Sequence, residues 1–178
     1  MIFNLGRRFG EMKGIQPSIK KLVIGGRNLR VVAPFYIEVD FNCSMEILVV
    51  RGNYSSTNPH VTSKNFPSDK TGIETFHVCM IQFNEEVEIP VKEVREVIRE
   101  LYCREADAKE LLTFGIQYPK IQKECPIIGL GSIWNDPDGR QDVVALNADE
   151  SGLFRTLELA WIKDKGFPCF TVYVCVFI

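Results

Sequence analysis

The feature that most constrains the fold is a pair of consecutive helical patterns in the middle of a chain that otherwise favours strands. In the first pattern, apolar side chains recur at spacings of three, four and three residues, which places them in one stripe of a helix. They are Val91, Val94, Ile98 and Leu101. Pro90 suits the first helical position, where its missing N–H costs no hydrogen bond. The second helix is predicted to begin at Asp107, which forms a capping box with Glu110, and to end at Tyr118-Pro119.

Strand-like segments lie on both sides of this helix pair. Those before it are 22–24, 28–32, 36–41, 46–50 and 75–84, with Pro34 breaking one run and 51–69 read as a long polar loop. Those after it are 126–134, 142–147, 156–162 and 169–178. A doubly wound sheet would alternate strands and helices, so this order argues against one. We predict an α+β protein with a mostly antiparallel sheet, divided into a basic arm (1–20), a β-rich unit (21–70) and an α+β domain (71–178).

Composition excludes several classes of protein. Of the 178 residues 46% are apolar and 11% aromatic, which is incompatible with a disordered chain. No segment approaches the roughly 18 consecutive apolar residues of a membrane span. The first residues lack an apolar core after their positive charges, so no secretory signal is predicted and a cytoplasmic location is expected. The six cysteines include no CxxC pair and are expected to be reduced and inert. We expect no metal and no cofactor.

The net charge of −2 conceals a division along the chain. Residues 1–30 hold seven basic groups against Glu11 alone, a net charge of +6, so the remainder holds 14 basic and 22 acidic groups and carries −8. The seven are Arg7, Arg8, Lys13, Lys20, Lys21, Arg27 and Arg30. They could contact nucleic acid or fold back onto the acidic remainder, and the sequence leaves both alternatives open.

One stretch resembles a known set of proteins. The segment 110–119 reads ELLTFGIQYP, and 122–134 reads QKECPIIGLGSIW. This block is similar to one in a family of uncharacterised proteins from candidate-phylum bacteria, and Gly52-Asn53-Tyr54 and Asn65-Phe66-Pro67 fit the same family. The layout of that family resembles the C-type-lectin-like scaffold, in which two helices lie between a first and a last strand that pair together. The resemblance implies that 76–83 pairs with 169–178 and that the N-terminal strands form a separate appended unit.

The resemblance favours a non-enzymatic binding module that presents the loops between its C-terminal strands to a macromolecule, because loops on a rigid scaffold tolerate variation. The candidate ligand-binding residues are Asn135, Asp136, Asp138, Arg140, Asp149, Glu150 and Trp161. Trp134-Asn135-Asp136 also spells the calcium-coordinating triplet of C-type lectins. The accompanying Glu-Pro-Asn is missing and Asp138-Gly139 is a strong turn signal, so we interpret this segment as a hairpin turn.

Two other functions stay open. The first is a nucleic-acid-associated accessory factor that uses the basic residues of 1–30. The second is a cysteine-dependent enzyme, for which His77 and Cys79 offer an imidazole and a thiol on one face of a strand. No third group that would orient the pair can be named, so we assign no catalytic residue.

Overall fold

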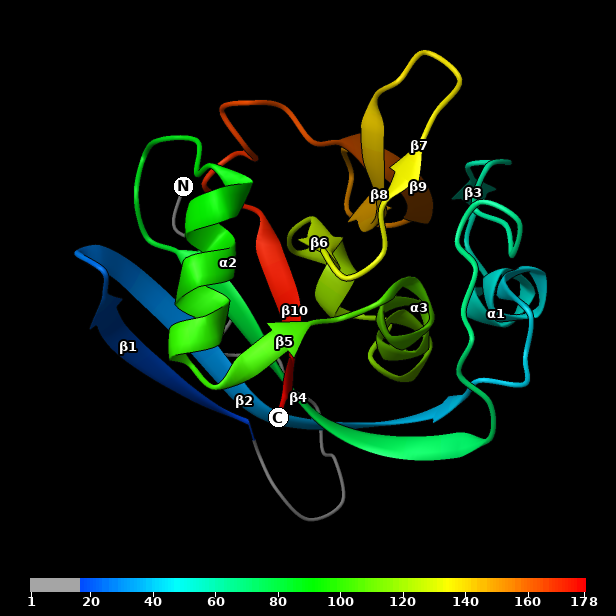
Figure 1. The fold of residues 1–178 in the computed structure, drawn as a ribbon, viewed down its shortest axis with the longest axis horizontal. Coiled ribbons are helices and arrows are strands. Elements are labelled where there is room, and N and C mark those ends of the chain that lie inside the picture. Colours follow the sequence, from blue (N-terminus) through cyan, green and yellow to red (C-terminus); the bar gives the residue numbers. More distant parts are fainter. Residues whose placement is uncertain (1–16) are drawn as a thin grey trace.

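A computed structural model describes residues 17–178, which form a ten-stranded sheet with helices on both faces (Figure 1). The helices are α1 (Met45–Gly52), α2 (Val91–Glu100), α3 (Ala108–Gln117) and the short 3-10 turn η1 (Ile121–Lys123). The strands are β1 (Ser18–Ile24), β2 (Arg27–Asp40), β3 (Ser56–Thr57), β4 (Ile73–Phe83), β5 (Cys103–Glu105), β6 (Ile127–Ile128), β7 (Trp134–Asn135), β8 (Gln141–Ala148), β9 (Arg155–Trp161) and β10 (Val172–Phe177). The predicted class, α+β with a mostly antiparallel sheet, is confirmed.

The sheet order is β1-β2-β4-β10-β6-β8-β9-β3, with β5 beside β10 and β7 beside β8. Strand β10 pairs antiparallel with β4 from Val172 opposite Gln82 to Val176 opposite Val78, so the predicted pairing of 76–83 with the last segment is confirmed. Strand β10 is apolar throughout because both of its faces are buried: Val174 packs on the side of α3 and Tyr173 on the side of α2.

The N-terminal strands belong to the same sheet. Strand β2 pairs with β4 over ten register positions, so the units expected on either side of residue 70 are joined in one sheet. The prediction that Pro34 separates two strands is wrong. Strand β2 continues through it with a register shift between Val32 and Phe35, where a bulge requires no ladder hydrogen bond from proline.

Two further strand predictions are wrong. Residues 46–50 lie in α1, because the Ser44 hydroxyl caps the amide of Ile47 and the next segment packs against the helix. The predicted strand 126–134 is reduced to β6 and β7. Between them, Gly131 donates its N–H to the carbonyl of Ala106 at 2.9 Å, and a Cβ on Gly131 would lie 2.8 Å from that same oxygen. The segment therefore presses against the start of α3 instead of extending the ladder.

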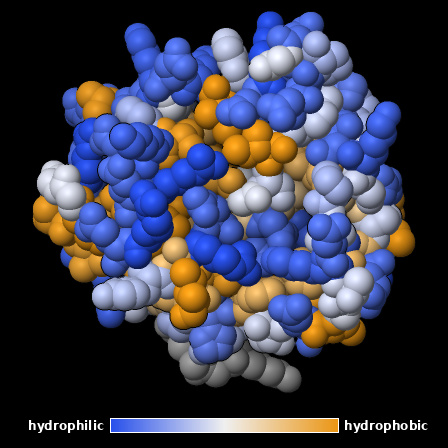
Figure 2. Space-filling model, in the orientation of Figure 1, coloured by the Kyte–Doolittle hydropathy of each residue, from blue (hydrophilic) through white to orange (hydrophobic). Residues whose placement is uncertain are grey.

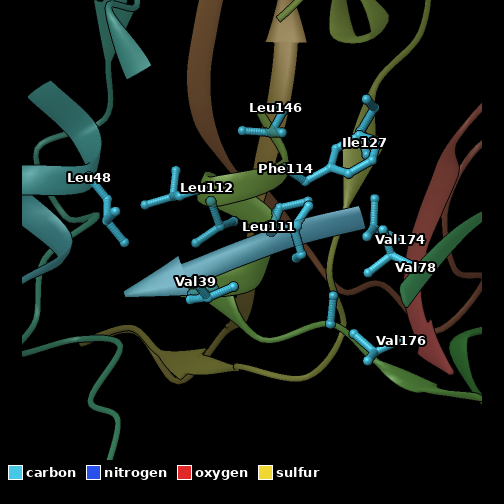
Figure 3. Packing of buried hydrophobic residues seen from close by; sticks show 14 of the residues in the cluster. Val39, Leu48, Val78, Leu111, Leu112, Phe114, Ile127, Leu146, Val174 and Val176 are labelled. Carbon is cyan, nitrogen blue, oxygen red and sulfur yellow. The ribbon is translucent and has the colours of Figure 1, made fainter. Parts of the chain in front are cut away.

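Two apolar cores lie on opposite faces of the sheet. One packs α1 and α3 against the sheet, and Figure 3 shows Leu112 of α3 on the side of Leu48 of α1, and Phe114 of α3 beside Ile127 of β6. The other packs α2 against the sheet. Among residues 17–178 no helix is long and apolar enough to cross a membrane.

Both predicted helices are confirmed, and so is the capping box of α3. The Asp107 carboxylate accepts from the Glu110 amide at 2.9 Å, and the Glu110 carboxylate accepts from the Asp107 amide at 2.8 Å. Glu110 is fully buried and also accepts from Arg104 and Lys70. Burial alone would raise the pKa of Glu110, but these donors outweigh it and lower that pKa. At the start of α3, Glu110 therefore completes the capping box and also forms ion pairs with Arg104 and Lys70.

Arg155, the first residue of β9, connects the two helices on its face of the sheet. Its guanidinium donates to the carbonyls of Gly52 in α1 and Gly115 in α3, each at 2.7 Å, and to Oε1 of Gln122 at 3.0 Å. Its Cζ lies 4.7 Å from the ring centre of Tyr54. A Cβ on Gly115 would lie 2.9 Å from the Tyr54 hydroxyl. The side chain of Arg155 therefore contacts four residues of the segments that resemble the candidate-phylum family: Gly52, Tyr54, Gly115 and Gln122.

Replacing Arg155 by methionine should lower the free energy of unfolding by about 3 kcal/mol, because the carbonyls of Gly52 and Gly115 lose their donors. Urea unfolding measures this difference. The control is Lys120→Met, an exposed site of the same charge, which should change the free energy of unfolding by no more than about 0.5 kcal/mol. Equal free energies of unfolding for the two variants would contradict the claim that Arg155 stabilises the fold by donating to these carbonyls.

Candidate functional site: two tryptophans around Asp142

Both tryptophans of the chain flank the same acidic residue at one end of the sheet. In the strand register, Asp142 of β8 lies opposite Trp134 of β7 on one side and opposite Trp161 of β9 on the other. Directly paired residues point to the same face, so the three side chains form a row across three strands. They share the face of the sheet that carries α1 and α3, because Val144 and Leu159 of the same strands pack there.

Asp142 lies between the tryptophans with only 9% of its surface exposed. Burial raises the pKa of its carboxyl, the charge of Asp136 raises it further, and Arg140 acts in the opposite direction. Trp161 is 47% exposed and Trp134 is half-buried. The row therefore combines an open indole surface with a partly desolvated acid, an arrangement suited to recognising a partner that has apolar and donor groups.

The turn between β7 and β8 is held by Asp136. One oxygen of its carboxylate accepts from the amides of Asp138 and Arg140, at 2.9 and 2.7 Å. Gly139 has φ of +80°, a conformation that glycine adopts readily. The predicted hairpin turn is confirmed. Asp136 acts here as a turn residue that places Arg140 at the surface.

Two cations lie over Trp161. The Arg140 Cζ is 5.2 Å and the Lys163 Nζ is 5.6 Å from its ring centre. Both distances are within the range of a cation–π interaction, which at an exposed site contributes about 0.5–1 kcal/mol. The exposed indole thus contacts one cation that precedes β8 and one that follows β9.

His60 extends the row beyond Trp134. Its ring stacks on Trp134 with centroids 5.1 Å apart and an interplanar angle of 23°. The segment that carries it is fixed to the start of α1, where Glu46 accepts from the amide and hydroxyl of Ser63, both at 2.8 Å. Within residues 17–178 no hydrogen bond joins the His60 ring to an acid or a nucleophile. The His60 ring therefore contributes an aromatic face beside Trp134.

The seven ligand-binding residues predicted from sequence lie in two groups at opposite ends of the hairpin formed by β8 and β9. Asn135, Asp136, Asp138, Arg140 and Trp161 lie at the tryptophan end. Asp149 and Glu150 lie in the turn at the far end, about 20 Å away along an eight-residue strand. Asp149 accepts from the amides of Leu153 and Phe154 and from the Ser151 hydroxyl, and this bonding lowers the pKa of Asp149. It is a turn residue.

Comparison of the chain with protein-family models, curated proteins and solved structures finds no significant match.

Sequence reasoning missed Trp134 as an aromatic partner, Asp142, His60 and Lys163. A signal for Asp142 is present in the sequence. In an antiparallel hairpin, paired residues are equally far along the chain from the centre of the turn. A turn centred between Ser151 and Gly152 therefore places Asp142 opposite Trp161. His60 had no such signal, because its position depends on contacts between a loop and α1.

The basic residues predicted to bind nucleic acid are only partly described. Arg7, Arg8 and Lys13 lie outside the described residues. Arg27 forms ion pairs with Glu85 and Glu93. Lys20 and Lys21 are exposed on β1, and Lys21 lies opposite Arg30. The exposed cations of this group therefore lie along one edge strand.

Of the two residues relevant to a cysteine enzyme, Cys79 is buried and His77 is exposed. Cys79 is 1% exposed, and its Sγ lies 3.8 Å from that of Cys103. Cys103 acts to lower the pKa of the Cys79 thiol, but the neighbouring Cys175 and burial together outweigh it and raise that pKa. His77 packs edge-on against Tyr36 at 4.6 Å. A buried neutral thiol is a poor nucleophile. Among residues 17–178 no three His, Cys, Asp or Glu side chains are grouped as a metal ion requires.

Replacing Glu46 by glutamine should remove an acid-labile part of the stability. The backbone amide of Ser63 and the other donors around Glu46 lower the pKa of its carboxyl from 4.5 to about 2. A lowered pKa stabilises the fold above pH 4.5, and this contribution disappears as the pH falls towards about 2. The free energy of unfolding, measured between those limits, should therefore fall more steeply in the natural chain than in Glu46→Gln. Parallel curves would contradict this role.

Proposed function

We propose that this protein is a non-enzymatic binding module that recognises a macromolecule through the end of the β7–β8–β9 sheet. The observation that carries the proposal is the row of Trp134, Asp142 and Trp161, with cations over the exposed indole. Tryptophan and arginine are the residues most enriched among those that dominate binding energy at protein interfaces.

The arrangement of elements supports the same proposal. We infer a C-type-lectin-like scaffold, since β4 pairs with β10 and the chain between them contains α2 and α3 followed by short strands. On such a scaffold the first and last strands hold the domain together, and the intervening strand ends are free to carry recognition. The tryptophan row lies at these ends. The analogy is one of fold, and the site carries the function.

Affinity capture from a lysate of the source cell, followed by titration of the purified ligand, tests this function. We expect a component that the natural chain retains and Trp161→Ala loses, with Kd raised about 30-fold or more, the size typical of an interface hot spot. The control is Phe154→Ala, an aromatic residue with 57% of its surface exposed at the far end of the same hairpin. This variant should bind normally.

The proposal fails if Trp161→Ala and Phe154→Ala bind the captured ligand equally well. It fails as well if no component distinguishes the natural chain from Trp161→Ala. Both variants must unfold at the same urea concentration as the natural chain, so that a loss of binding reports on the surface.

A second candidate function is association with nucleic acid through residues 1–30. Lys20 and Lys21 favour it, because both are exposed on the edge strand β1. Deleting 1–30 would remove β1 and the start of β2, so a charge reversal is the better test. Lys20→Glu with Lys21→Glu should abolish retention on a DNA column and flatten its salt dependence. Absence of binding by the natural chain at low salt would exclude this function.

A further inference from the structure

The face of the sheet opposite the tryptophan row contains a groove beside α2. It has a volume of about 300 Å³. Its lining consists of Val91, Lys92, Arg95 and Arg99 of α2, Glu105 of β5, and Ile133, Gln141 and Ile162 at the ends of the three strands. Ile133 and Ile162 pack against the core on the α2 side, whereas Trp134 packs against the core on the α3 side. The groove and the tryptophan row are therefore separate surfaces.

The charges of α2 are divided between two sides of the helix. At 3.6 residues per turn, the three cations fall within about 60° of one another, and so do three acids on the adjacent flank. The acids are Glu93, Glu96 and Glu100. On the acidic flank, Glu93 accepts from Arg27 of β2 at 2.9 Å. Figure 2 shows hydrophilic side chains over the face that α2 occupies, with apolar surface beside them.

This division places like charges one turn apart along each flank of α2. It places Arg95 four residues before Arg99 and Glu96 four residues before Glu100, and like charges at that spacing destabilise a helix by about 0.2–0.5 kcal/mol per pair. Opposite charges offset this cost, because Lys92 lies four residues before Glu96 and Glu96 lies three residues before Arg99. On the groove side three cations face the single acid Glu105, so the groove carries a net positive charge.

The cations retain unused donors. The only recorded partner of Arg95 within residues 17–178 is Glu105, at 3.2 Å from Nε, which leaves its two terminal NH2 groups available. In the same described part of the chain Lys92 and Arg99 have no ion pair, and both are exposed. Arg95 and Arg99 are one helical turn apart, a spacing at which two guanidinium groups can contact one phosphoryl group.

We propose that this groove binds a small phosphate-bearing ligand of nucleotide size. The phosphoryl group binds at Arg95 and Arg99, and the remainder of the ligand extends towards Lys92 over Ile133 and Ile162. The volume of about 300 Å³ is at the lower end of the range for small-molecule sites. The acidic flank of α2 lies within a Debye length of the groove and opposes a longer polyanion, which favours a short ligand over a nucleic acid strand.

Two-dimensional ¹⁵N NMR of the full chain, titrated separately with ADP, inorganic pyrophosphate and adenosine, tests this proposal. ADP should shift the amides of α2, Ile133, Gln141 and Ile162, and pyrophosphate should shift those of α2 more weakly. Adenosine without phosphate should have no effect. Arg99→Gln should weaken ADP binding about tenfold, the loss expected for one charge-assisted contact. The control Glu100→Gln, next along the helix on the acidic flank, should bind ADP at least as tightly as the natural chain.

Several results would overturn the proposal. One is the absence of shifts in α2 with millimolar ADP or pyrophosphate, and another is equal ADP affinity of Arg99→Gln and the natural chain. If pyrophosphate binds as tightly as ADP, the groove is an adventitious anion site only. If a single-stranded oligonucleotide binds more tightly than ADP and loses that affinity in Arg99→Gln, the ligand is nucleic acid. None of these results depends on the tryptophan row, so the two sites are tested independently.

Discussion

The arrangement of this protein on one side of its sheet depends on the guanidinium of Arg155. Burial lowers the pKa of this group, and within residues 17–178 no carboxylate forms an ion pair with it. Its two terminal NH2 groups donate instead to two carbonyls, at the end of α1 and within α3, and to a glutamine amide, and the face of Tyr54 lies beside it. Its buried Nε has no hydrogen-bond partner among residues 17–178. A guanidinium suits this position because its planar fork donates in several directions at once, which an ammonium on a flexible stem does not. Removing the side chain leaves the carbonyls of Gly52 and Gly115 without these donors, which destabilises both α1 and α3.

The same strand that is fixed by Arg155 at its start carries Trp161 at its end. Strand β9 is also paired with β8 along its whole length, so the exposed indole extends from a backbone held in a ladder. Rigid aromatic residues lose little conformational entropy on binding, which makes such a position effective for recognition. The two faces at this end of the sheet differ in chemistry: one has indoles around a buried acid, and the other has cations above isoleucines. The two proposed sites rest on this difference.

The helix pair and the capping box at Asp107 were predictable from local spacing, whereas the pairing of β4 with β10 was implied by the resemblance to the C-type-lectin-like scaffold. The helix α1 was not predictable from apolar content. Its sequence is rich in residues that also favour strands, and the Ser44 cap decides the outcome. The prediction of a strand over 126–134 was wrong for a different reason. Gly131 packs closely on Ala106, and no local pattern encodes such a long-range contact.

The site shows the same division. Arg140 and Trp161 could be selected from turn chemistry and exposure, and the structure brings them together. Asp142 could be found only by working out the hairpin register, and His60 depends on the Glu46–Ser63 contact between a loop and a helix. The role of Arg155 was hidden because an arginine at the start of an alternating strand resembles a solvent-exposed residue. Its partners are nevertheless Gly52, Tyr54, Gly115 and Gln122, which belong to the segments that resemble the candidate-phylum family.

The central claim is that the end of the β7–β8–β9 sheet is a preformed, rigid surface. The most direct test is the measurement of ¹⁵N backbone order parameters in the free protein, together with that of the Trp161 indole N–H. The account predicts values of about 0.85 for residues 134–142 and for Trp161, equal to those of β4 and β10. Values below about 0.6 in this region, with the central strands rigid, would contradict it.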